Sequence, residues 1–225
     1  MSQITGRRPY AARLPAEERR TQLLDAALRI AADQGFAAVT MDRVARAAGV
    51  TRPVVYGLFP DRGALLSALL ERETARAQAA LTTVLPPVPG AGDDIDPDAL
   101  LVAGIRAYLT AVRESPDTWR LVLFPVEGAP PELQAAVAAS RNESLEQISR
   151  LLTWGIAARR TQVSRPETPV LTSLLTARVD VELFARMLVG LAEGAARMVL
   201  DEPDSWPVER FAVFTQQMLE ALAVR

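Results

Sequence analysis

The side chains with the most distinctive chemistry in this sequence lie between Thr40 and Phe59, and they are hydrogen-bond donors and small apolar groups rather than nucleophiles. Arg52 is a long donor whose guanidinium can bind a guanine edge in the major groove of DNA. Its neighbours are short enough to contact thymine methyl groups: Thr51, Pro53 and Val54. Gly57 either leaves room for a DNA backbone or is simply a weak helix residue. The segment therefore indicates recognition of nucleic acid.

Enzymatic chemistry has little support in the composition. The chain contains no histidine and no cysteine, so a Ser-His-Asp or Cys-His site cannot form and a zinc site would need carboxylates alone. The acidic residues are scattered on polar helix faces or in loops such as Asp93-Asp94. A site built from paired carboxylates, or from an arginine and a carboxylate, remains the alternative of this class, but we expect no enzyme activity, no metal and no cofactor.

Two short helical patterns position the candidate residues. In the first, apolar residues recur at i, i+3, i+4 and i+7 and form one buried stripe: Met41, Val44, Ala45 and Ala48. Thr40 is placed to cap this helix, and Asp42 suits its positive end. Gly49 follows the stripe, where a left-handed residue ends a helix and turns the chain.

The second pattern begins after this turn. Thr51 is placed to cap it, and Pro53 falls in the first turn, where proline is tolerated. Val55 and Phe59 point inward at i and i+4, which leaves Arg52 on the outside. Two helices joined by a three-residue turn that contains glycine are a helix-turn-helix, whose second helix enters the major groove.

An ordered set of further signals surrounds the helix-turn-helix at 40–59. It consists of Asp33-Gln34-Gly35-Phe36, Val39-Thr40-Met41, Val44-Ala45, Ala48-Gly49-Val50, Val54-Val55-Tyr56, Phe59-Pro60 and Asp61-Arg62-Gly63-Ala64-Leu65-Leu66. With this set, residues 17–77 resemble the DNA-binding domain of the TetR family of bacterial transcriptional regulators. The resemblance covers about a quarter of the chain, and the rest matches in size and helical character alone.

The resemblance implies roles for residues at matching positions of the family pattern. Phosphate contacts would come from Thr40, Arg43, Tyr56 and Arg62. Each of these residues has an ordinary alternative as a cap, a packed aromatic ring or a solvated charge. The resemblance also implies a homodimer that binds a pseudo-palindromic operator in double-stranded DNA and responds to a small-molecule effector bound in the larger domain.

Charge is distributed unevenly along the chain. Residues 1–66 hold ten arginines and six acidic residues, whereas the rest holds 15 arginines and 21 acidic residues. The positive excess coincides with the helix-turn-helix, as contact with phosphate requires, although an ordinary fluctuation gives the same numbers. Residues 1–15 lack apolar periodicity and are interpreted as a flexible basic arm, which either reaches into the minor groove or does nothing specific.

Helical patterns continue to the end of the chain. They cover residues 16–34, 61–85, 98–114, 116–124, 131–158, 168–176, 179–200 and 207–223, with breaks rich in proline and glycine between them. No alternation typical of strands competes with these patterns. We therefore expect an all-α fold, in which an N-terminal three-helix DNA-binding domain at 17–77 is followed by a larger helical domain at 78–225 for ligand binding and dimerisation.

Two sets of apolar residues in the larger domain predict its contacts. The helices near 179–200 and 207–223 are apolar around much of their surface, and their predicted dimer contacts are Phe184, Leu188, Gly190, Leu191, Gly194, Phe211, Phe214 and Met218. The alternative is that both helices lie in the core of a monomer. The predicted walls of an apolar ligand pocket, unless they are simply core residues, are Tyr108, Trp119, Leu123, Phe124, Trp154 and Met187.

These patterns lead to one functional hypothesis and one alternative. We expect a ligand-responsive DNA-binding transcriptional regulator, a homodimeric repressor that a small, apolar effector releases from its operator. The alternative is an architectural DNA-binding protein without small-molecule control, which the large acidic C-terminal part argues against. No apolar run approaches the roughly 20 residues that cross a bilayer, and no signal peptide is present, so we expect a cytoplasmic protein without membrane contact.

Overall fold

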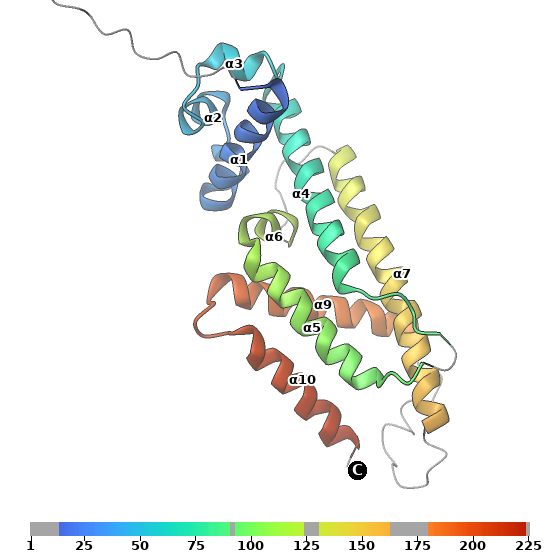
Figure 1. Ribbon diagram of the computed structural model, residues 1–225. Coiled ribbons are helices and arrows are strands. Elements are labelled where there is room, and N and C mark those ends of the chain that lie inside the picture. The colour runs from blue at the N-terminus through green and yellow to red at the C-terminus, as the bar shows by residue number, and fades with distance from the viewer. Residues whose placement is uncertain (1–13, 91–92, 124–130, 163–179, 224–225) are drawn as a thin grey trace, which may run out of the picture. The chain divides into compact units, whose positions relative to one another are not determined.

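The computed structural model describes residues 14–90, 93–123, 131–162 and 180–223, and every regular element within these ranges is helical (Figure 1). The elements are α1 (Ala16–Gln34), the short 3-10 helix η1 (Phe36–Ala38), α2 (Met41–Ala47), α3 (Arg52–Tyr56), α4 (Arg62–Val84), α5 (Pro97–Glu114), α6 (Pro116–Leu123), α7 (Pro131–Gln162), α9 (Val181–Asp201) and α10 (Val208–Ala223). The expected all-α fold is confirmed. The predicted helix at 168–176 and most of the N-terminal arm lie outside the described residues.

The chain divides into two compact units, and the division falls inside α4. Unit 1 ends at Leu69 and unit 2 begins at Leu70. Within unit 1, α1 packs against η1 and α2, and α2 packs against α3. Within unit 2, α5 packs against α9 and α10, and α7 packs against α9.

Unit 1 is built on the inner face of α1, where Leu23 and Ala27 are completely buried. The elements that follow contribute further buried side chains to this core: Val39, Val44, Val55, Phe59 and Leu65. The guanidinium of Arg20 lies 4.8 Å from the centroid of the Phe59 ring and covers its face. Val55 and Phe59 therefore point inward as predicted, and α3 keeps its opposite side for solvent.

Local signals set the ends of these helices. The Thr40 hydroxyl accepts a hydrogen bond of 3.3 Å from the backbone N–H three residues later, so Thr40 caps α2 as predicted. Gly49 has a φ of 66°, in the left-handed region that glycine adopts without strain. Asp61 accepts a hydrogen bond of 2.8 Å from the N–H three residues on and caps the start of α4. Thr51 precedes α3, but its side chain makes no capping hydrogen bond, contrary to the prediction.

The core of unit 2 forms where α5, α6, α9 and α10 meet the later turns of α4. Its buried members are Ala77, Leu109, Val112, Trp119, Ala196, Val199, Leu200 and Val208. The rings of Tyr108 and Trp119 meet edge to face, with 5.4 Å between their centroids. α5 and α10 lie side by side (Figure 1), and Arg106 joins them through two hydrogen bonds of 2.9 and 2.8 Å to the carboxylate of Glu209.

Candidate nucleic-acid interface and cavity

Several side chains that the sequence analysis predicts to contact DNA lie on the outer face of α3. Val54 and Tyr56 are 38% and 45% exposed, whereas Val55 between them is completely buried. The other predicted contacts that are exposed are Thr40, Thr51, Arg52, Pro53, Gly57 and Arg62. The helix thus separates a core side from a side that is open to a binding partner.

Arg52 is held by two neighbours on this face. Its Nε lies 2.6 Å from Oδ1 of Asp42 in α2, and its guanidinium carbon lies 5.8 Å from the centroid of the Tyr56 ring. A hydrogen bond with the Tyr56 side chain and the charge of Asp42 raise the pKa of Arg52, so the side chain is always charged. Because the ion pair is exposed and weak, the guanidinium can exchange Asp42 for a base edge.

Two arginines that were predicted to bind phosphate make hydrogen bonds inside unit 1. Nε and Nη2 of Arg62 donate to the backbone carbonyls of Val39 and Phe36, each at 2.7 Å. Arg43 donates to a backbone carbonyl at 3.3 Å and is half-buried. Both guanidinium groups are thus hydrogen-bonded to the segment between α1 and α2. A phosphate contact from either arginine has to use its remaining N–H groups.

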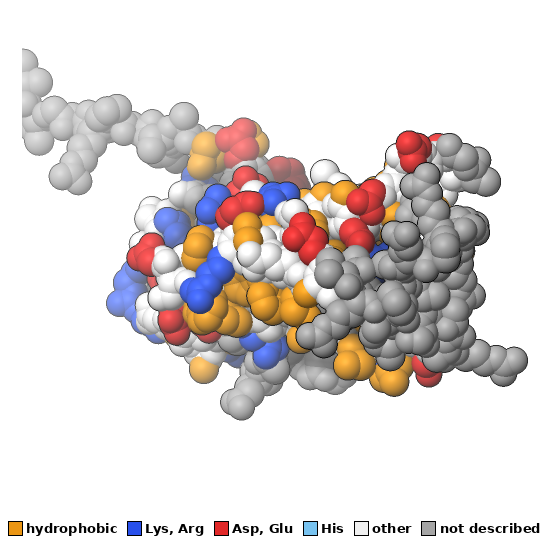
Figure 2. Space-filling view, turned by 90° about the horizontal axis from the view of Figure 1, so that it is seen from below, with side chains coloured by type: hydrophobic (Ala, Val, Ile, Leu, Met, Phe, Trp, Pro, Cys, Tyr) orange, Lys and Arg blue, Asp and Glu red, His pale blue; other side chains and the backbone are white. Residues whose placement is uncertain are grey.

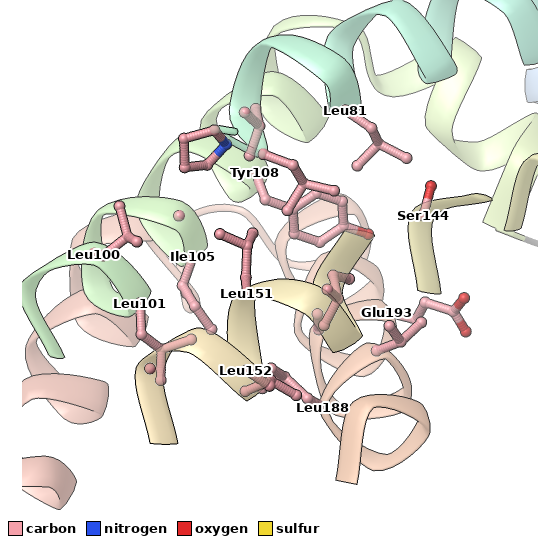
Figure 3. A pocket seen from close by; sticks show the side chains of 18 of the residues that line it. Leu81, Leu100, Leu101, Ile105, Tyr108, Ser144, Leu151, Leu152, Leu188 and Glu193 are labelled. Atoms are coloured by element: carbon pink, nitrogen blue, oxygen red, sulfur yellow. The ribbon is translucent and has the colours of Figure 1, made fainter. Parts of the chain in front are cut away.

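Unit 2 contains a cavity of about 390 Å³ whose walls come mainly from α4, α5, α6, α7 and α9 (Figure 3). The walls are largely aliphatic and include Leu81, Leu100, Leu101, Ile105, Leu151, Leu152 and Leu188. Small-molecule sites in proteins span about 300–1,000 Å³ and are lined mainly by apolar side chains. The cavity has the size and the character of such a site.

Polar groups of the cavity lie toward its ends. Ser144, Glu193 and the Tyr108 hydroxyl lie on the side of the cavity away from Leu100 and Leu101 (Figure 3). Burial, followed by the charge of Glu193, raises the pKa of Tyr108 well above its ordinary value, so its hydroxyl stays protonated.

Two ion pairs also line the cavity. Nη2 of Arg141 lies 2.6 Å from Oε2 of Glu193 and joins α7 to α9. Further along α7, Arg159 pairs with Asp98 at the start of α5. Each of these charges is matched by an opposite charge in the same wall.

α9 and α10 also carry large apolar side chains that are exposed in the described part of the chain. The large hydrophobic residues exposed on these helices are Leu183, Phe184, Met187, Leu191, Val213, Phe214 and Met218. Leu191 is 72% exposed and Phe214 is 61% exposed. Hydrophobic side chains also gather on the molecular face shown in Figure 2. Exposed apolar side chains in such numbers on two consecutive helices are typical of a surface that another chain covers.

Comparison with known proteins agrees with this architecture. The sequence profile described as "Bacterial regulatory proteins, tetR family" matches residues 23–69, which contain α2, α3 and the beginning of α4. A TetR-like transcriptional regulator from Rhodococcus sp. RHA1 has the same fold, with a TM-score of 0.67 and 24% identity over 95% of this chain and 100% of that chain. The chain belongs to the TetR family. It is a DNA-binding transcriptional regulator.

Curated relatives of this TetR-family chain are transcriptional regulators as well. The HTH-type transcriptional activator FasR of Mycolicibacterium smegmatis is 28% identical over 153 residues, which are 67% of this chain and 67% of FasR. The HTH-type transcriptional regulator EthR of the same organism is 27% identical over 125 residues, which are 56% of this chain and 54% of EthR. The chain therefore spans between about half and two thirds of the length of these relatives.

The cavity of this TetR-family regulator includes most of the pocket residues that the sequence suggested. Those in its wall are Tyr108, Trp119, Leu123 and Trp154. Phe124 lies outside the described residues. Met187 requires a correction, because it is 59% exposed on α9 and does not line the cavity. Its position places it with the uncovered apolar residues instead.

The residues predicted for dimer contact divide into two groups. Those exposed on this TetR-family chain are Phe184, Gly190, Leu191, Gly194, Phe214 and Met218. Leu188 is half-buried and lines the cavity, as Phe184 does as well, so its part in a dimer stays a prediction. Phe211 is half-buried: its ring packs against the core of unit 2 and lies 6.2 Å from that of Trp206, and its contact with a partner also stays a prediction.

The aliphatic walls that α5 and α7 contribute were missed at the level of sequence. Leucines at helical spacing look the same whether they face a core or a cavity, so the pattern gives no means of choosing. The glycine at position 104, inside a helical pattern, is the one sequence feature that could have indicated the cavity. This glycine lines the cavity, and an added Cβ would meet no atom within 4 Å. Within the described ranges, no helix is long and apolar enough to span a membrane and no three acidic side chains cluster as metal ligands would.

Proposed function

We propose that this protein is a homodimeric repressor that a small, apolar effector releases from a pseudo-palindromic operator. The cavity of unit 2 carries this proposal, because a mostly apolar space of about 390 Å³ suits a small organic molecule. A DNA-binding segment joined to such a space is the arrangement that a ligand-controlled switch requires. An architectural DNA-binding protein has no use for the cavity, which favours control by a ligand over that alternative.

Dimerisation is supported by the exposed apolar side chains of α9 and α10. Burial of one large apolar side chain, such as Leu191 or Phe214, contributes about 1.5–3 kcal/mol. Gly190 and Gly194 are exposed and four residues apart, so they share one side of α9. An added Cβ at either glycine would meet no atom within 4 Å, which leaves space for a partner helix to approach. Two such helices from each subunit would form a four-helix interface.

The dimer would present α3 to DNA twice. Two recognition helices about 34 Å apart reach successive major grooves on one side of B-DNA, which explains the expected pseudo-palindrome. Arg52 would read a guanine, while its small neighbours would meet thymine methyl groups. Tyr56 and Thr40 would contact phosphates beside the bases, with help from the remaining N–H groups of Arg43 and Arg62.

α4 is the element through which an effector would act. Thr74, Ala77 and Leu81 of this helix line the cavity, and the helix begins at Arg62 within the segment that the family profile matches. An effector changes DNA affinity only to the extent that it binds the DNA-competent and DNA-incompetent forms differently. A tenfold loss of DNA affinity requires about 1.4 kcal/mol of such a difference.

Of the two modes of regulation, repression requires fewer contacts than activation. A repressor needs only to occupy its operator, whereas an activator needs a further contact with the transcription machinery. The relative FasR is named an activator, so its likeness to this chain does not favour repression. A reporter fused to the regulated promoter separates the two, because loss of the regulator raises expression under repression and lowers it under activation.

The full proposal is tested with purified protein and duplexes from its own promoter region. We expect a species of twice 24.4 kDa by light scattering, binding to one promoter duplex that excess random DNA does not displace, and release by an apolar compound that also stabilises the protein thermally. A single subunit that does not distinguish promoter from random DNA contradicts the proposal. Specific binding without any compound that stabilises or releases the protein favours the architectural alternative.

A further inference from the structure

The charged residues in the cavity wall balance each other. Two are arginines and two are carboxylates: Asp98, Arg141, Arg159 and Glu193. Arg141 lies 2.6 Å from Glu193, and Arg159 pairs with Asp98. Since each of these four charges has a partner, the described residues of the wall offer no net charge to attract an ion.

The cavity follows one face of α7 for much of its length. The lining residues of this helix recur at intervals of three and four, as Arg141, Ser144, Ile148, Leu151, Gly155 and Arg159 show. At 1.5 Å per residue, Arg141 and Arg159 are separated by about 27 Å along the helix. The cavity is therefore elongated along α7, which suits an extended chain better than a compact ring system.

Hydroxyl groups accompany the ion pair between α7 and α9. Tyr108 and Ser144 lie toward the same end of the cavity as Glu193 (Figure 3). Because burial raises the pKa of Tyr108, its hydroxyl remains a donor. The Ser144 hydroxyl donates to the carbonyl of Ser140 at 3.1 Å, so its oxygen can still accept a hydrogen bond. An uncharged end group that donates and accepts matches these two hydroxyls.

A ligand with an ionised end group would be disfavoured at this end of the cavity, beside the Arg141–Glu193 pair. Glu193 is the more buried member of its pair with Arg141, with side-chain exposures of 20% and 54%, so a carboxylate that drew Arg141 away would leave the Glu193 charge without its partner beside the apolar cavity. An ammonium group could bind Glu193 only by displacing Arg141 from the same carboxylate. Arg197 also acts on Tyr108, but it is exposed, lies outside the cavity wall and donates to a backbone carbonyl at 3.0 Å.

We infer that the effector is an electrically neutral, extended chain molecule whose uncharged hydrogen-bonding end group lies beside Tyr108, Ser144 and the Arg141–Glu193 pair. Its aliphatic body lies along α7, against the leucines of α5 and α7. This inference rests on the proposed control of the protein through the same cavity.

Three probes of equal chain length test the preference for neutral molecules: decanol, decanoate and decylammonium. Trp119 and Trp154 line the cavity, so the tryptophan fluorescence of the full-length protein reports binding at neutral pH, below the micelle concentration of each probe. Decanol is expected to bind at least tenfold more tightly than either ion. Binding of decanoate or decylammonium that equals or exceeds that of decanol overturns the inference.

Charge-neutralising variants give a second, reciprocal test. Glu193→Gln leaves Arg141 without its partner, so decanoate should gain at least tenfold relative to decanol, and Arg141→Gln should give the same gain to decylammonium. Glu182→Gln is the matched control, because Glu182 forms an exposed pair of 2.9 Å with Arg186 on the same helix. The ratio of two affinities on one preparation does not depend on the fraction that folds. Unchanged ratios in both cavity variants overturn the inference.

Gly104→Leu tests the location of the chain. An added Cβ at Gly104 meets no atom within 4 Å, so the leucine side chain has room to enter the cavity and should lower decanol affinity at least tenfold. Undiminished binding overturns the assignment to this cavity.

The DNA affinity, measured with each probe, separates this inference from the proposed function. If decanoate binds more tightly than decanol and releases DNA, control by an effector stands and the preference for neutral molecules is wrong. If decanol binds as inferred without any change in DNA affinity, the inference about the cavity stands and effector control fails. If no probe binds, the inference is overturned.

Discussion

The hydroxyl of Thr118 donates a hydrogen bond to Oε2 of Glu73 across 2.6 Å in the interior of unit 2. Glu73 is completely buried, and its other oxygen accepts hydrogen bonds from Arg72 at 2.7 Å and from Arg76 at 3.1 Å. The interaction joins α6 to α4. Thr74, which follows Glu73, and Trp119, which follows Thr118, both line the cavity. A buried carboxylate at this place is satisfied only while the two helices keep their relative position.

Replacement of Thr118 by valine should therefore destabilise unit 2. Valine keeps the shape of threonine but removes the donor, and a buried acceptor that loses a partner costs about 1–3 kcal/mol. Urea denaturation followed by circular dichroism measures the effect. Thr82→Val is the control, because the Thr82 hydroxyl donates to a backbone carbonyl on the exposed side of the same helix. Equal losses in the two variants would show that the Glu73–Thr118 hydrogen bond is not important for stability.

Tyr108 should make the stability of the protein sensitive to alkaline pH. Burial raises its pKa in the folded protein, whereas in the unfolded chain the phenol ionises near its ordinary pKa of about 10. The resulting stabilisation is complete below this value and is lost as the pH rises from about 10 toward the folded pKa. Tyr108→Phe should therefore lose less thermal stability than the wild type between about pH 9 and 11. Tyr56→Phe, at an exposed position, should follow the wild type, and a parallel decline in all three proteins would contradict the prediction.

Arg52 should determine preference for one base pair in each half-site. Arg52→Ala should cost about 1–3 kcal/mol on the operator, because a guanine contact is lost, and much less on random DNA. Fluorescence anisotropy with both duplexes at one salt concentration measures the difference. Arg29→Ala, which removes an exposed arginine of α1, is the control for the change in charge. Equal losses on the operator and on random DNA would reassign Arg52 to phosphate binding.

Leu191 should be essential for the dimer. It is 72% exposed, so Leu191→Glu should leave the isolated subunit folded but place a charge in the proposed apolar interface. We expect analytical ultracentrifugation to show a monomer at concentrations where the wild type is a dimer. Ala103→Glu adds the same charge at an exposed position of α5 and should remain dimeric. A Leu191→Glu dimer with wild-type affinity would exclude this face of α9 from the interface.

Substitution of Gly49 should lower the stability of the protein because of the backbone conformation at this position. Its φ of 66° is unfavourable for residues with a Cβ by about 1–2 kcal/mol, and an added Cβ would meet no atom within 4 Å. Gly49→Ala should thus lower the free energy of unfolding by about this amount, as measured by urea denaturation. Gly49→Asn should cost less, because asparagine tolerates the left-handed region better. If both variants cost the same, the conformation of the turn is not the cause.

The local elements could be predicted because their signals lie within a few residues of each other. The first helix was expected at 16–34 and is observed there, and the stripe from Met41 to Ala48 with Gly49 behind it predicts α2 and its end. Helical periodicity and caps depend on neighbours three and four residues away, so the chain shows them directly. Thr51 shows the limit of this reasoning, because a suitable residue at a cap position does not have to form the hydrogen bond.

Contacts between distant segments could not be predicted in the same way. Glu73 and Thr118 are 45 residues apart, and nothing in either helical pattern predicts that this one carboxylate is buried while its neighbours are exposed. Arg62 matched a phosphate-binding position, yet its guanidinium reaches back 26 residues to a carbonyl of η1. Met187 and Leu188 are adjacent in sequence, but packing leaves the first at the surface and turns the second into the cavity.

The sequence by itself determined the helices, the turn at Gly49, the family and the side of α3 that is available to DNA, because each depends on residues within one or two helical turns. Only the tertiary structure decided which leucines line a cavity, which arginines are paired and which apolar side chains stay uncovered. Those outcomes depend on the direction from which a second helix arrives, and the periodicity of one helix is the same whether its apolar side meets a core, an open channel or a partner.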